Sequence, residues 1–283
     1  MKNGMLIIDA DGHAVDNEGV YRERLPEQYR KRSFIHPSDG FDRHQNGKIK
    51  KQPQDAAQNL ADNDREGIDL QIIYPTGGLM LSRVREPDYA IALARTYNDW
   101  LADWCSIDKK RLKGVAVAFH ASGSDTLDPL GHFENFLQIH TCSHAPEQLL
   151  ACTAVIYSGL LEKYQDLRVA FLEAGIGWVP FWMEHMDEEY EFRRFEAPLL
   201  KMKPSEYMAC GRVYVSCEPE EKTLRYVPDF FPEENILFAS DYPHWDGEFP
   251  YAVAHLANRN DLSAEFKQKI FRDNPQRFYG LAD

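Results

Sequence analysis

Short apolar runs bounded by turn residues alternate along this chain with longer segments of helical periodicity. The apolar runs predict β-strands at 6–9, 70–74, 114–119, 169–172, 213–216 and 236–239. The segments between them predict helices at 55–66, 88–105, 147–164, 179–195, 220–226 and 264–277. Strands that are apolar on both faces and are separated by helices indicate βα units and a parallel sheet. The sequence therefore predicts an α/β fold.

Acids or imidazoles follow five of these strands. In chain order they are Asp11 with His13, then His120, Glu173, Glu218 and Asp241. In a parallel α/β protein the carboxyl ends of all strands lie on one face, where functional groups gather. A single Asp after a strand is ordinary, because Asp and Pro are common where strands stop. The recurrence predicts instead an active-site rim that includes Asp241, in the stretch ASDYPHWDG.

The stretch IIDADGH places Asp11 and His13 two residues apart. If the strand continues through them, both side chains lie on one face, which Asp9 would share. Such a pair can hold a metal ion from two directions. The alternative is a hydrogen-bonded turn in which Gly12 takes a positive φ. With His120 and Asp241 the set becomes two imidazoles and two carboxylates, which suits Zn²⁺, Mn²⁺, Fe²⁺ or Co²⁺.

The chain resembles the amidohydrolase superfamily, in the group that includes aminocarboxymuconate semialdehyde decarboxylase and the resorcylate-type decarboxylases. The matching stretches span nearly the whole chain in order. They are IIDADGH, LADNDREGIDLQIIYPT, YNDWLADWCSIDKKRLKGVAV, HAPEQLLACTAVIYSGLLEKYQDLRVAFLEAGIGWVPFWMEHMDE, ILFASDYPHWDG and KIFRDNPQRFYGL.

The resemblance implies a (β/α)₈ barrel with one divalent metal ion, with zinc as the first choice and manganese as the alternative. The implied ligands are Asp11, where the family has His or Glu, and His13, His120 and Asp241. The catalytic histidine of the decarboxylases falls on Glu173.

A departure from the family lies in the middle of the chain, where RLKGVAV runs directly into AFHAS. The family has a helix, a strand and a further helix there. The expected fold is therefore a single TIM-barrel-like domain over residues 1–283 that is shortened in the middle and forms an incomplete barrel, with a polar insertion loop near 36–54. An open barrel exposes strand edges that a partner subunit could cover, so a homodimer is expected.

Composition narrows the class of protein. The formal net charge of -13 would repel a phosphate backbone, so nucleic acid is not an expected partner. No apolar run approaches the roughly 18 residues that span a bilayer, and the N-terminus lacks a signal-peptide pattern. The expectation is a cytoplasmic protein that acts on a small molecule. Its five cysteines contain no C-x-x-C pair and predict neither disulfides nor a thiolate zinc cluster.

The leading hypothesis is a metal-dependent hydrolase that acts on a small carbonyl or carboxylate compound through a metal-activated water. Asp241 is predicted as ligand and general base, and Glu173 as a second acid/base or a group that orients a ligand. His144, placed at a helix start by the Ala-Pro after it, and His244 are predicted to contact substrate. The alternatives are a nonoxidative decarboxylase of an aromatic or unsaturated acid and a non-catalytic binding protein.

Overall fold

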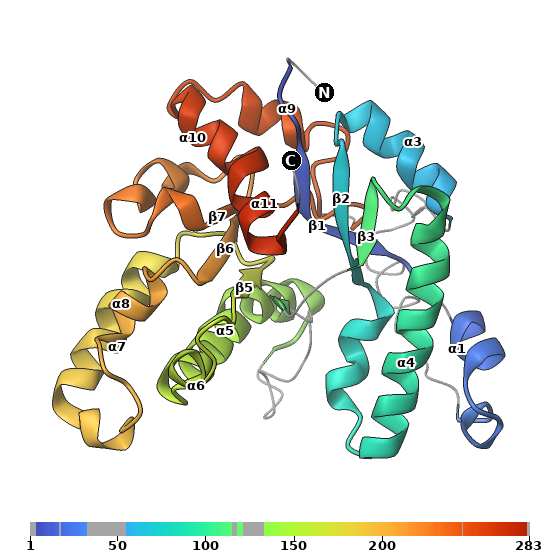
Figure 1. Ribbon diagram of the computed structural model, residues 1–283, viewed down its shortest axis with the longest axis horizontal. Coiled ribbons are helices and arrows are strands. Elements are labelled where there is room, and N and C mark those ends of the chain that lie inside the picture. Colours follow the sequence, from blue (N-terminus) through green and yellow to red (C-terminus); the bar gives the residue numbers. More distant parts are fainter. Residues whose placement is uncertain are drawn as a thin grey trace.

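The computed structural model of the chain describes residues 4–16, 18–32, 55–114, 118–120, 133–244 and 246–281. The predicted insertion loop near 36–54 lies outside these residues. Two parallel sheets form the centre of the molecule (Figure 1). The first has the order β1 (Ile8–Ala14), β2 (Leu70–Pro75), β3 (Leu112–Gly114). The second has the order β4 (Ala118–His120), β5 (Val169–Leu172), β6 (Val213–Cys217), β7 (Ile236–Phe238).

The two sheets join where β1 meets the chain that leaves β7. Asp241 N donates to Asp11 O at 3.0 Å, and His13 N donates to Tyr242 O at 2.8 Å. Apolar side chains from both sheets also meet in one buried cluster with the C-terminal helix. Its fully buried members are Ala10, Ile72, Tyr74, Ala170, Leu172, Tyr214, Leu237 and Phe278. The sheets therefore enclose a common interior, as expected for a TIM-barrel-like fold.

Strand β5 shows how the sequence divides the inside of this fold from the outside. Ala170 and Leu172 join the interior cluster, whereas Val169 and Phe171 belong to the larger core that packs against the helices. Successive side chains of a strand point to opposite faces, so a strand buried on both faces reads as an unbroken apolar run. This is the pattern from which the parallel sheet was predicted.

The predicted strand 114–119 is wrong as a single element. Gly114 ends β3 and pairs with Ile73 of β2, whereas Ala118 begins β4 and pairs with Ala170 of β5. The chain thus passes from one sheet to the other within one apolar run. Hydrophobicity alone could not locate this crossing, because each strand has only three residues.

The helices lie on the outside of the two sheets (Figure 1). Predicted helices are found as α3 (Ala56–Glu66), α4 (Pro87–Trp104), α5 (Phe136–Tyr157) and α7 (Val179–Arg193). The predicted helix 264–277 is divided into α10 (Ala264–Gln268), a π-helical turn (Lys269–Asp273) and α11 (Asn274–Tyr279). The predicted helix 220–226 is a 3₁₀ turn at Lys222–Arg225. The prediction missed α1 (Glu18–Arg24), α6 (Leu160–Lys163) as a separate helix, α8 (Pro204–Met208) and α9 (Ala252–Ala257).

Helix α5 begins eleven residues before its predicted start at 147, although Pro146 lies inside it. A proline in a helix interior removes one backbone hydrogen bond. Packing against the sheet outweighs that loss, because Gln148 Nε2 donates to Phe119 O at 3.2 Å and to Leu172 O at 2.9 Å. The prediction that His144 stands at a helix start is therefore wrong, and His144 lies within α5.

Helix α11 packs against β1 and β7 and adds side chains to the interior cluster. Phe278 packs on Tyr214, with ring centroids 4.8 Å apart, and Tyr279 Oη donates to Ala10 O at 2.9 Å. Gly280 ends the helix at φ 63°, in the left-handed region that glycine adopts without strain.

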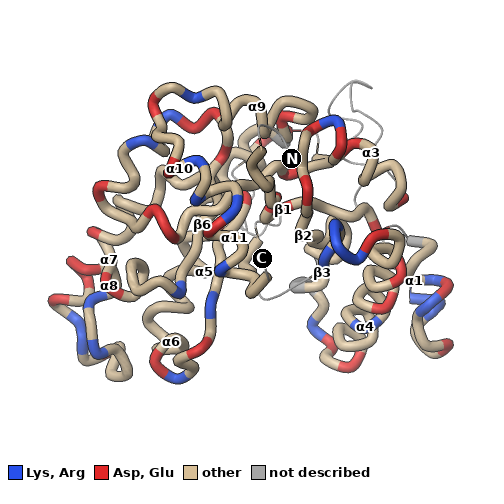
Figure 2. The backbone as a smooth tube through the Cα atoms, turned by 45° about the horizontal axis from the view of Figure 1, so that its top comes forward, with Lys and Arg blue, Asp and Glu red and all other residues tan. Residues whose placement is uncertain are grey.

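Charged residues of both signs are interspersed along the peripheral helices (Figure 2). None of the helices in the described part of the chain is long and apolar enough to cross a membrane.

Candidate metal centre

Strand β1 delivers Asp11 and His13 to the carboxyl end of the sheets. The strand continues to Ala14, so both residues belong to it, and both are buried. The pairing register with β2 shifts between Asp9 and Gly12. A bulge of this kind re-aims the neighbouring side chains. Asp11 Oδ1 lies 3.5 Å from His13 Nε2.

Asp9 serves a different purpose from its neighbours. Its carboxylate accepts hydrogen bonds from Ser240 N at 2.9 Å, from Ser240 Oγ at 2.6 Å and from Gln71 Nε2 at 2.8 Å. These bonds tie β1 to β2 and to the chain that leaves β7. The expectation that Asp9 joins the face of Asp11 and His13 is wrong, because the bulge separates it from them.

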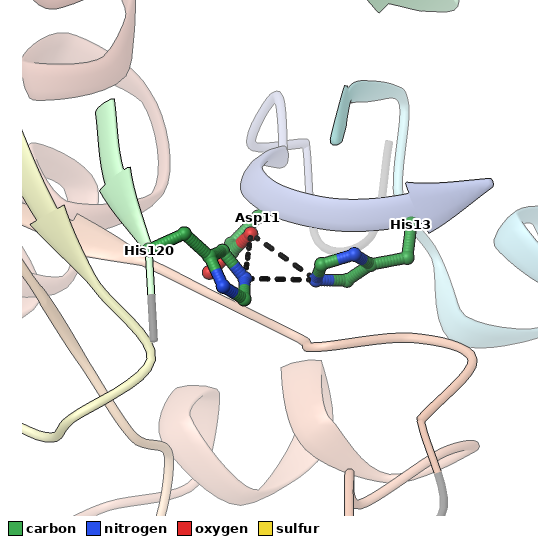
Figure 3. Close-up of side chains that lie close together, drawn as sticks. All are labelled: Asp11, His13 and His120. Atoms are coloured by element: carbon green, nitrogen blue, oxygen red, sulfur yellow. Dashed lines mark hydrogen bonds and ion pairs between the residues drawn. The ribbon is translucent and has the colours of Figure 1, made fainter. Parts of the chain in front are cut away.

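His120 reaches the same point from the end of β4 (Figure 3). Its Nε2 lies 3.1 Å from His13 Nε2 and 3.5 Å from Asp11 Oδ1. The three side chains come from two different sheets, and all three are nearly inaccessible to solvent. The tertiary fold therefore brings together the first three predicted ligands.

The other nitrogen of each imidazole is held by an acceptor. His13 Nδ1 donates to Pro75 O at 3.0 Å, and His120 Nδ1 lies 3.1 Å from Glu173 Oε2. An Nδ1–H that donates leaves the lone pair on Nε2, which is how proteins orient a metal-binding histidine. Burial, and then the charge of His244, lower the pKa of His13, which favours the neutral form that binds a metal.

The group fits a divalent ion on two observations. Both carboxylate oxygens of Asp11 are buried, and neither has a hydrogen-bond partner among the described residues. His13 Nε2 and His120 Nε2 lie 3.1 Å apart, and the Nδ1 atom of each ring already has an acceptor. Ligands at about 2.1 Å from one ion lie about 3.0–3.4 Å apart, so this separation matches two imidazoles on one metal.

Asp241 and Glu173 stand at strand ends in strained backbone. Their φ angles are 53° and 57°, in the left-handed region that side chains other than glycine rarely adopt. Such strain persists where the surrounding structure enforces it, and it is concentrated at functional sites. Asp241 Oδ1 lies 3.4 Å from His13 Nε2, and therefore adjoins the group of Asp11, His13 and His120.

His244 lies between these two acids. Its Nδ1 is 2.7 Å from Asp241 Oδ1 and 3.5 Å from Glu173 Oε1, and its Nε2 is 3.3 Å from Thr76 Oγ1. Burial lowers the pKa of His244, but the Asp241 and Glu173 carboxylates outweigh it and raise the pKa well above its ordinary value. Burial raises the pKa of Asp241, but His244 and His13 outweigh it and hold the pKa below its ordinary value. The metal-free site therefore holds a protonated imidazole between two carboxylates.

His144 lies at the edge of this site, with Nε2 3.9 Å from Glu173 Oε1. Sequence reasoning gave no role to Asp246, whose Oδ2 lies 3.4 Å from His140 Nε2. It also missed the Pro75 carbonyl and Thr76, because a backbone acceptor or a hydroxyl at a strand end carries no sequence signal. Only the position of Asp246, five residues after Asp241 in the same rim stretch, indicated that it could lie near the site.

Comparison with known proteins places the chain in a family. A sequence model described as "Amidohydrolase" matches residues 130–281, which is more than half of the chain. None of the curated proteins compared with the chain matches it significantly.

Solved structures match over nearly the full length of the chain. An amidohydrolase from Mycobacterium avium subsp. paratuberculosis is 14% identical with a TM-score of 0.72, covering 98% of this chain and 100% of its own. The 5-carboxyvanillate decarboxylase from Sphingomonas paucimobilis is 16% identical with a TM-score of 0.72, covering 99% and 100%. The 5-carboxyvanillate decarboxylase from Novosphingobium aromaticivorans was solved with manganese and 4-hydroxy-3-methoxy-5-nitrobenzoic acid. It is 17% identical with a TM-score of 0.70, and the match covers 98% of this chain and 97% of the decarboxylase. At these identities the likeness establishes the fold.

Proposed function

Because the chain belongs to the amidohydrolase family and is a metal-dependent enzyme, we propose that it hydrolyses a small carbonyl or carboxylate compound at the site of Asp11, His13 and His120. One observation carries the proposal. Asp11 Oδ1, His120 Nε2 and Asp241 Oδ1 converge on His13 Nε2 at 3.5, 3.1 and 3.4 Å. Asp11 Oδ1, His13 Nε2 and His120 Nε2 would hold the ion, and Asp241 Oδ1 would lie beside it.

Asp11, His13 and His120 would bind the metal, with Asp241 as the adjoining carboxylate. A divalent ion held there lowers the pKa of water and polarises a substrate oxygen. Two imidazoles and carboxylates are ligands that zinc accepts, and we propose zinc as the ion. Manganese is the alternative, and it is present in the decarboxylase from Novosphingobium aromaticivorans.

Asp241 and His244 would handle protons. The low pKa of Asp241 keeps its carboxylate ionised, and Oδ1 faces both His13 Nε2 and His244 Nδ1. It can therefore accept a proton from an attacking water, while the protonated His244 can donate one to a leaving group. Glu173 orients His120 through Nδ1 and stabilises the charge on His244. We favour hydrolysis because Glu173 adds negative charge where a decarboxylase of this type would carry an imidazole.

The second candidate is nonoxidative decarboxylation of an aromatic or unsaturated acid. Two observations favour it: the structural likeness to the 5-carboxyvanillate decarboxylases, and the cationic His244, which can pair with a substrate carboxylate or protonate a carbon. The two reactions differ in outcome, because hydrolysis incorporates water and decarboxylation releases CO₂.

The test begins with metal content and ends with isotope analysis. Wild-type protein, His13→Ala and His185→Ala are loaded with Zn²⁺ or Mn²⁺, and the bound metal is measured by elemental analysis. His185 lies on α7 beside Phe181 and is the matched control histidine. We expect His13→Ala to bind one equivalent less than wild type and His185→Ala to bind the wild-type amount.

The loaded proteins are then incubated with small amides, esters and aromatic carboxylates in H₂¹⁸O. Product containing ¹⁸O that depends on His13 supports hydrolysis, and CO₂ release without ¹⁸O in the organic product supports decarboxylation. Unchanged metal content in His13→Ala would refute the assigned site.

A further inference from the structure

A second group of metal-binding side chains lies beside the first. His140 and His144 are four residues apart on α5 and therefore lie on the same face of the helix. Their ring centroids are 4.4 Å apart. Asp246, from the chain that follows β7, approaches them, with Oδ2 3.4 Å from His140 Nε2. One donor atom from each of the three residues lies within 4.8 Å of the others.

The local helix geometry prepares His144 to be a ligand. Its Nδ1 lies 3.1 Å from His140 O and 3.2 Å from Ser143 Oγ. Because the carbonyl oxygen can only accept, Nδ1 carries the proton and the lone pair stands on Nε2. This is the arrangement found at His13, where Pro75 O holds Nδ1. In both groups a backbone carbonyl thus selects the tautomer that binds metal.

Glu173 stands between the two groups. Its Oε2 lies 3.1 Å from His120 Nδ1, and its Oε1 lies 3.9 Å from His144 Nε2. The carboxylate thus faces the first group with one oxygen and the second with the other. The Glu173 carboxylate would place negative charge between the two cations.

The charge balance of the site also calls for more than one cation. In the described part of the chain, the carboxylates of Asp11, Glu173, Asp241 and Asp246 form ion pairs with histidines, and neither Lys nor Arg reaches them. One divalent ion at Asp11 and Asp241 would leave Glu173 and Asp246 to be neutralised by imidazoles alone. Glu173 is largely withdrawn from water, where a carboxylate needs a compensating charge or metal, whereas Asp246 is exposed to solvent.

We propose that His140, His144 and Asp246 bind a second divalent transition-metal ion of the zinc type, next to Glu173. Two histidines at i and i+4 on a helix are a common way to place two imidazoles on one zinc ion. Three protein ligands leave a coordination position open, as in catalytic zinc sites. Both ions would adjoin the carboxylate of Glu173. This site goes beyond the proposed function, which needs only the first ion.

The test is a metal titration of the full chain after removal of metal with a chelator. Co²⁺ and Zn²⁺ are titrated by calorimetry, and the visible absorption of Co²⁺ reports each equivalent as it binds. We expect wild type to bind two equivalents. His144→Ala and Asp246→Asn should each bind one, His13→Ala should bind one, and the variant with both His13→Ala and His144→Ala should bind none.

His185→Ala is the control and should bind two equivalents. Circular dichroism checks that each variant folds, and Asp246→Asn, a nearly isosteric change outside any helix, decides the question if His144→Ala does not fold. A single equivalent in wild type that is lost in His13→Ala and kept in His144→Ala would overturn the second site. The second site would also be overturned if both Asp246→Asn and a folded His144→Ala bound two equivalents. Failure of the first site is recognised separately, because His13→Ala would then bind as much metal as wild type.

Discussion

The substitution Gly12→Ala tests how the two residues beside it are positioned. Gly12 lies within β1 between Asp11 and His13, and its φ is not in the positive region. The turn with a positive φ that the sequence allowed is therefore not its role. An added Cβ would lie 2.2 Å from Gln71 Nε2, 2.3 Å from Cδ and 2.5 Å from Cγ. Gly12 is required because the Gln71 side chain lies directly against it.

The cost follows from what Gln71 would have to give up. It is fully buried, its Nε2 donates to Asp9 Oδ2 at 2.8 Å, and its Oε1 accepts from Asn63 Nδ2 at 3.2 Å. Each buried partner left unpaired costs about 1–3 kcal/mol, and overpacking costs about 1–3 kcal/mol more. We expect Gly12→Ala to lower the free energy of unfolding by about 3–6 kcal/mol, the lower part of the summed range, because Asp9 keeps its two hydrogen bonds from Ser240.

The assay is urea unfolding of the metal-free protein, followed by metal titration. We expect metal affinity to fall about 10–100-fold, as when a partner that orients ligands is lost. The double variant with Gln71→Ala removes the clashing atoms, because all three lie beyond Cβ. Gly12→Ala should therefore cost under about 1 kcal/mol in that background, which gives an interaction energy of about 2–6 kcal/mol.

Two results would refute this reasoning. One is a Gly12→Ala protein that unfolds within about 1 kcal/mol of wild type and binds metal equally well. The other is additive behaviour in the double variant, which would show that the cost arises from the β1 backbone and not from contact with Gln71.

Three further predictions concern the rim of the site. Glu221 accepts hydrogen bonds from Ile176 N at 2.8 Å and from Gly177 N at 2.7 Å, in the loop that follows Glu173. Glu221→Ala should therefore lower the free energy of unfolding, measured in urea, by about 1–3 kcal/mol. An unchanged urea midpoint would contradict this. Partial burial, and then the charges of Asp241 and Glu221, raise the pKa of Glu218 to about 7. The metal-free folded protein therefore keeps a proton on Glu218 that the unfolded chain releases at lower pH. The stability of the fold consequently falls as the pH rises through about 7. Glu218→Gln should therefore raise Tm at pH 8 and leave it unchanged at pH 4, and equal gains at both would count against the pKa shift. Chelator should lower the Tm of wild type and of His185→Ala by more than that of His13→Ala, because His13→Ala has already lost the ion of the first site.

Much of the fold could be predicted because its signal is local. Strands such as Val169–Leu172 are buried on both faces, and their unbroken apolar runs distinguish them from the amphipathic helices between them. The division of one apolar run into β3 and β4 could not be predicted, because each half is defined only by the sheet with which it pairs. The start of α5 was missed for a similar reason, since contacts with β4 and β5 outweigh the signal of Pro146.

The sequence by itself determined which chemical groups stand at the strand ends, because a parallel sheet places the residues after its strands on one face. Asp11, His13, His120, Glu173 and Asp241 follow from that rule. Only the tertiary structure decided how these groups act on one another. The carbonyl that selects the His13 tautomer, the carboxylate of Glu173 beside His244 and the contact of Gly12 with Gln71 all join residues far apart in the chain. Such contacts depend on the distance and direction of side chains from different strands, which local periodicity does not encode.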